Sequence, residues 1–88
     1  MSEFWNLINE AEANLLEVEF TMMDARIYKG VPTSIVPMEN ENGDDYLDCT
    51  LRDAESLDPI VAIPLDDVVS VRRLDQPDTV IYAPKIAA

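Results

Sequence analysis

Carboxylates are the most abundant groups in this chain that could do chemistry. Eighteen acidic residues stand against six basic ones, and four aspartates form two adjacent pairs, Asp44-Asp45 and Asp66-Asp67. General acid–base catalysis needs a carboxyl group whose pKa is raised by burial beside a substrate pocket. Adjacent aspartates in polar stretches supply neither condition, so we interpret both pairs as solvated loops. A weak Ca²⁺ or Mg²⁺ site is the alternative, but the spacing in residues 39–45 does not fit an EF-hand loop. We therefore expect no metal and no cofactor.

The only cysteine, Cys49, and the absence of histidine narrow the chemistry further. Histidine is the usual general base and the commonest transition-metal ligand. A reactive thiol needs a histidine or a positive environment to lower its pKa, so we expect Cys49 to be a small core residue. One cysteine cannot close an internal disulfide, which favours a reducing compartment. We expect a cytoplasmic protein that is not an enzyme.

Arg72 and Arg73 form the only adjacent basic pair. They could pair with acidic neighbours, including those of another subunit, or leave a small anion or RNA contact on one face. The formal net charge of −12 repels phosphate backbones and anionic membranes. The same charge attracts basic partners. We expect no nucleic acid and no membrane as partners, and we keep a basic protein as an open alternative.

The first element that could position these groups is a helix over residues 3–14. Ser2 is a suitable N-cap, and Glu3 is favourable in the first turn. Apolar residues then recur at helical spacing and predict one buried stripe; they are Phe4, Leu7, Ile8, Ala11 and Leu15.

Beyond the helix the apolar period changes to two, which is typical of half-buried strands. The predicted strands cover residues 16–22, 26–36, 46–52, 60–65 and 68–74. Gly30 interrupts the second strand and marks a bend. We predict a single domain, 1–88, in which a helix (3–14) precedes a small barrel (15–74) and a tail (75–88). Residues 79–82 of the tail could add a short strand.

This order of elements resembles the Sm-like fold of Sm and Lsm proteins. Tyr28-Lys29-Gly30 matches the bend of the first Sm motif, and residues 60–74 match the second motif in outline. The resemblance covers residues 3–74. It implies a mainly β fold, with an N-terminal α-helix followed by a five-stranded, strongly bent antiparallel SH3-like barrel.

The resemblance also implies a homo-oligomeric ring, in which the last strand pairs with an edge strand of the next protomer. We expect five to seven subunits. A closed ring would cover edge strands that are hazardous when unpaired. The residues expected at this interface are Ile60, Ala62, Val68, Val69, Ser70 and Val71.

The chain departs from RNA-binding Sm rings at the positions that read RNA. The turn between its last two strands is Asp66-Asp67 rather than Arg-Gly, and the earlier loop carries four carboxylates. Our leading interpretation is therefore a non-catalytic ring scaffold or interaction module. The alternatives are a diverged RNA-binding ring that uses Arg72 and Arg73, and an acidic nucleic-acid mimic that inhibits a basic host protein. Small size and acidity resemble proteins of bacteriophages or environmental viruses, which would act in the host cytoplasm.

Overall fold

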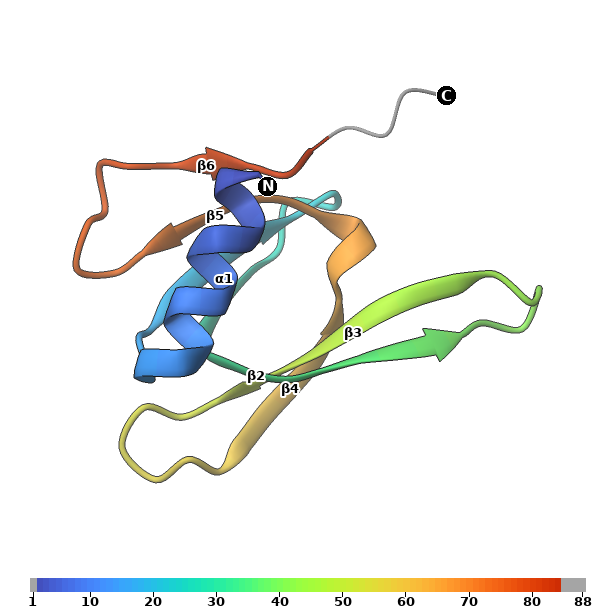
Figure 1. The fold of residues 1–88 in the computed structure, drawn as a ribbon, viewed down its shortest axis with the longest axis horizontal. Coiled ribbons are helices and arrows are strands. Elements are labelled where there is room, and N and C mark those ends of the chain that lie inside the picture. Colours follow the sequence, from blue (N-terminus) through green and yellow to red (C-terminus); the bar gives the residue numbers. More distant parts are fainter. Residues whose placement is uncertain (1, 85–88) are drawn as a thin grey trace.

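The computed structural model describes residues 2–84 and shows one helix in front of a β-sheet (Figure 1). The elements are α1 (Glu3–Asn14), β1 (Val18–Met22), β2 (Ile27–Glu39), β3 (Asp45–Arg52), β4 (Pro59–Pro64), the 3₁₀ turn η1 (Leu65–Asp67), β5 (Val68–Arg73) and β6 (Ile81–Tyr82). All strand pairs are antiparallel, in the order β4-β3-β2-β1-β5-β6. The mainly β fold behind an N-terminal helix is confirmed. Among residues 2–84 the strand count of five is corrected to six by β6, which lies where the tail was predicted to add a short strand, and the strands form one open sheet.

Helix α1 begins and ends where the sequence predicted, for identifiable local reasons. The Ser2 hydroxyl oxygen accepts a hydrogen bond from the Trp5 amide at 3.3 Å, which caps the N-terminus. Leu15 ends the helix in a left-handed conformation with φ of 54°. That turn directs Leu15 into solvent, so its predicted place on the buried stripe is wrong. Phe4, Ile8 and Ala11 form the buried face.

Strand β2 changes its hydrogen-bonding partner partway along its length. Residues 27–30 pair with β1, whereas residues 31–39 pair with β3. Gly30 lies at this change, and a Cβ there would lie 2.9 Å from the carbonyl oxygen of Arg52. A bulge follows, in which Ser34 and Ile35 together oppose Cys49, and Ser34 has a φ of 50°. Both irregularities bend β2 and turn the outer half of the β2–β3 hairpin away from α1 (Figure 1).

The two edges of the sheet differ. Strand β6 covers β5, with Ser70 opposite Tyr82 and Val71 opposite Ile81. The Ala83 amide extends this contact by donating to the Val69 carbonyl at 2.8 Å. Strand β4 ends the sheet on the other side, and its outer edge has no partner strand among residues 2–84.

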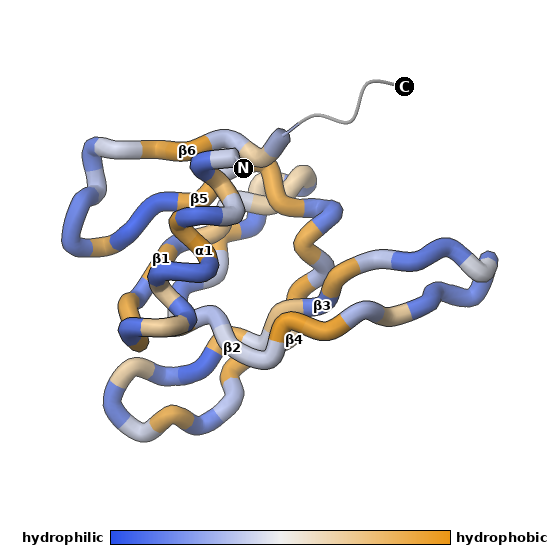
Figure 2. The backbone as a smooth tube through the Cα atoms, in the orientation of Figure 1, coloured by the Kyte–Doolittle hydropathy of each residue, from blue (hydrophilic) through white to orange (hydrophobic). Residues whose placement is uncertain are grey.

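The core lies between the buried face of α1 and the concave side of the bent sheet. Phe20, Leu51 and Ile63 bring β1, β3 and β4 into this core, and each is almost fully buried. Figure 2 shows hydrophilic residues gathered at the tip of the β2–β3 hairpin, which projects away from the core. Within residues 2–84, no helix has the length and apolarity that crossing a membrane requires.

Candidate functional site

Arg72 lies in a row of charged side chains across three strands, on the face of the sheet opposite Phe20. Its Nε and Nη2 donate to the two carboxylate oxygens of Glu19 at 3.0 and 3.2 Å. Lys29 Nζ lies 3.7 Å from the same carboxylate. The register explains this row, because Glu19 of β1 stands opposite Lys29 of β2 and Arg72 of β5. Glu19 is therefore buried, although its alternation with Val18 and Phe20 along a half-buried strand would place it on the solvent face.

Arg73 points to the other side of β5 and also meets carboxylates. Its Nη1 donates to Glu10 Oε1 at 3.0 Å, and its Nε and Nη2 donate to the Asp75 carboxylate at 2.9 and 2.6 Å. The hydrogen bond from Arg73 lowers the pKa of Asp75. Both predicted anion-contacting arginines thus bind acidic groups of their own chain. The anion or RNA contact remains a prediction.

Cys49 lies in the core, where the sequence placed it. Its side chain is fully buried, and this burial raises the pKa of the thiol to about 11. A thiol with a raised pKa carries little thiolate at neutral pH and is a poor nucleophile.

The six residues expected at an oligomer interface fall into two groups. Val68, Ser70 and Val71 are buried within this chain. Ile60, Ala62 and Val69 are exposed, and the first two lie on the free edge strand β4. Because β6 pairs with β5, the main-chain groups expected to bind a neighbouring protomer at residues 69–71 are already covered.

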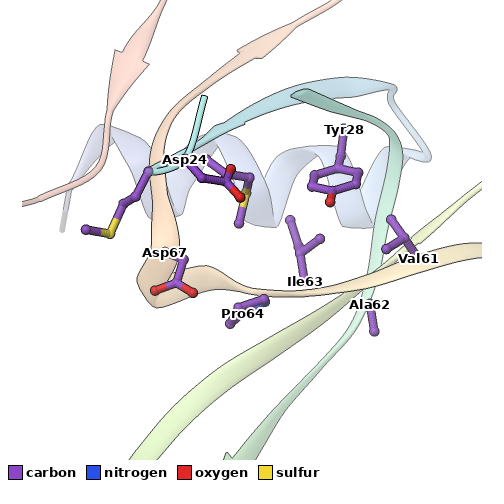
Figure 3. Close-up of a pocket in the computed structure, with 9 residues that line it drawn as sticks. Asp24, Tyr28, Val61, Ala62, Ile63, Pro64 and Asp67 are labelled. Carbon is purple, nitrogen blue, oxygen red and sulfur yellow. The ribbon is translucent and has the colours of Figure 1, made fainter. Parts of the chain in front are cut away.

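A cleft of about 240 Å³, lined by seven apolar or aromatic residues and by Asp24 and Asp67, lies between β4 and the β1–β2 turn (Figure 3). Its lining residues are Met22, Met23, Asp24, Tyr28, Val61, Ala62, Ile63, Pro64 and Asp67. Tyr28 and Ile63 point toward one another across it, whereas Ala62 and Pro64 point to the other side of β4 (Figure 3). The alternation of side chains along β4 thus gives the strand one face toward the cleft and one face away from it.

An acidic groove of about 590 Å³ adjoins the cleft. Its lining residues are Asn40, Asp44, Asp45, Tyr46, Asp48, Ala62, Pro64, Asp66 and Asp67. The fold therefore brings both aspartate pairs together, although 20 positions separate them in the chain, and it adds Asp48. Sequence reasoning missed this convergence. Its only signal was the placement of both pairs at strand ends.

The cleft and the groove form one continuous surface, because both include Ala62, Pro64 and Asp67. We call this surface the β4 face. Asp44, Asp45, Asp66 and Asp67 are all exposed, so none has the burial that general acid–base catalysis requires. Within residues 2–84, no three carboxylate or thiol side chains are arranged to hold a metal ion. The β4 face thus presents mainly apolar side chains, with Asp24 and Asp67, at the cleft and a concentration of carboxylates along the groove.

The chain was compared with protein-family models, curated proteins and solved structures, and no match was found in any of the three.

Proposed function

We propose that this chain is a non-catalytic interaction module that binds a basic segment of a partner protein along its β4 face. The observation that carries the proposal is the joining of an apolar cleft and an acidic groove on either side of one unpaired edge strand. Protein interfaces combine an apolar core with a polar rim, and complementary charges steer the partners together. An enzyme would need a buried titratable group beside this surface, and the aspartates there are exposed or only half-buried.

We propose further that the bent sheet is an open form of the Sm-like small barrel. Three features support this: the long β2 shared by two partners, the close approach of Gly30 to β3, and the single turn η1 between β4 and β5. The helix before β1 fits the same order of elements.

The charge of the chain favours a basic protein over other partners. A net charge of −12 repels nucleic acid and repels a second copy of the chain. Five aspartates on the groove concentrate that charge where Ala62 and Pro64 of β4 are accessible. Lys and Arg side chains of a partner would be attracted to this surface and steered toward it.

The test is a titration of ¹⁵N-labelled protein with oligolysine, followed by amide chemical shifts. We expect shift changes concentrated at Ala62, Asp66 and Asp67 that weaken as salt is added. The variant D66N/D67N should bind about threefold to tenfold more weakly. D58N/D78N makes the same change in net charge at exposed positions away from the groove and should bind like the parent chain. Equal weakening in both variants, or no binding at low salt, would contradict the proposal.

A homo-oligomeric ring of five to seven subunits is the second candidate. It is favoured by the unpaired edge of β4 and by the short β6, since a neighbouring protomer would have to displace only its two residues and the Ala83 amide from β5 among residues 2–84. Light scattering at two protein concentrations tests it. A stable mass five to seven times 9.9 kDa would support the ring, and a monomer at both concentrations would exclude it.

A further inference from the structure

The free edge of β4 offers main-chain groups as well as side chains. An edge strand is a template for an added strand, because alternate N–H and C=O groups along it lack partners. Pro59 and Pro64 bound β4 and have no N–H, so within β4 the main-chain donors available to an added strand come from residues 60–63. Ile60 and Ala62 are exposed within this segment. The short segment limits the number of main-chain hydrogen bonds that an added strand can accept from β4.

The cleft lies on one side of β4 and the groove on the other, and together they determine which side chains an added strand can carry. Val61 and Ile63 line the apolar cleft, whereas Ala62 and Pro64 also line the acidic groove (Figure 3). Side chains of an added strand alternate between the same two faces. One set would enter the cleft beside Tyr28, and the other would lie along the aspartates.

The volume of the cleft and the charge of the groove determine which side chains of the added strand can lie in each. The cleft holds about 240 Å³, below the ~300–1,000 Å³ that is usual for a whole small molecule. It is suited to one apolar side chain, packed against Met22 and Met23. On the other side, Asp44, Asp45 and Asp66 favour Lys or Arg and disfavour another acidic chain.

The geometry points to strand addition as the mode of binding: an extended segment of the partner, in which apolar and basic residues alternate, adds to the edge of β4. This inference rests on the proposed function, since it names how the same β4 face holds its basic partner. Main-chain hydrogen bonds supply the affinity, and the alternating pattern supplies the specificity.

Three peptides of equal length separate this mode from simple charge attraction. The first is Lys-Val-Lys-Val-Lys-Val-Lys. The second has the same composition with its lysines and valines in two blocks, and the third is the alternating peptide with N-methyl groups on every second amide. Calorimetry should show the alternating peptide binding at least about tenfold more tightly than either of the others. We expect M23K to weaken that peptide, because Met23 lines the cleft, and I27K to leave it unchanged, because Ile27 is exposed outside it.

Each outcome has one meaning. Equal binding of all three peptides would overturn strand addition and leave the basic-partner function standing. No binding of any of them, or of oligolysine, would overturn both. A chain that self-associates in light scattering and excludes the alternating peptide would show that a second copy occupies the edge, which also overturns the inference.

Discussion

Replacing Glu19 with Gln tests whether the charged row across β1, β2 and β5 stabilises the fold. The side chain of Glu19 is only 10% exposed and accepts two hydrogen bonds from the Arg72 guanidinium. The substitution removes a negative charge and turns an amide group toward Arg72 and Lys29. Breaking a fully buried ion pair costs about 3–5 kcal/mol. Arg72 and Lys29 are 35% and 60% exposed, so solvent lowers the expected loss to about 1–3 kcal/mol.

The assay is urea unfolding followed by the fluorescence of Trp5, the only tryptophan, which packs against the core. A loss of about 1–3 kcal/mol corresponds to a fall in Tm of roughly 5–20 °C for a domain of this size. E17Q is the matched control, because Glu17 is exposed and makes no ion pair among residues 2–84. It should change the free energy of unfolding by less than ~0.5 kcal/mol.

Ionic strength provides a second test of whether the Glu19 carboxylate is buried. Exposed ion pairs are largely screened at high ionic strength, whereas a pair with a buried carboxylate is screened much less. The difference between E19Q and E17Q should therefore persist in ~0.5 M NaCl. If E19Q and E17Q unfold at the same urea concentration, Glu19 is solvated in solution and the argument from burial is refuted.

Two further predictions concern single residues in the sheet and core. G30A should destabilise the chain by about 1–3 kcal/mol, because its Cβ would lie 2.9 Å from the Arg52 carbonyl oxygen; equilibrium urea unfolding measures the loss. G43A, whose Cβ would meet only a Glu39 oxygen at 3.9 Å, should show the smaller loss of about 1 kcal/mol from its left-handed backbone, and equal losses would contradict the clash. Raising the pH from 9 to 11 should lower the stability of the parent chain by about 1–3 kcal/mol more than that of C49A. The Cys49 thiol ionises near 9.0 when unfolded but near 11 when folded, so its contribution is complete below pH 9 and lost as the pH rises; parallel pH profiles of the parent and C49A would contradict it.

Local patterns were sufficient to predict most of the elements. The helix bounds follow from Ser2 as a cap and from apolar residues at helical spacing, both of which act within a few residues. Period-two alternation, β-rich composition and, for β4, a continuous apolar run predicted β1 to β5 to within a few residues of their bounds. Short strands with alternating faces leave few other conformations that bury their apolar side chains.

Local patterns failed where a partner strand decides the outcome. Glu19 lies on the face that alternation assigned to solvent, yet Arg72 of β5 and Lys29 of β2 enclose it. Strand β6 pairs with the part of β5 where a neighbouring protomer was expected, and the interface itself stays a prediction. Neither contact has a signal within a few residues, because both depend on segments that meet only after the sheet has formed.

The sequence by itself determined that this chain forms a small, acidic, mainly β domain behind a capped helix. Composition, apolar period and capping residues act locally or through total charge, and both can be read without coordinates. Only the tertiary structure decided that Arg72 and Arg73 are neutralised within the chain and that the two aspartate pairs meet beside an open edge of β4. The bend of β2 and the turn η1 bring these groups close together. Both features depend on the free energy of long-range packing, which no single stretch of residues determines.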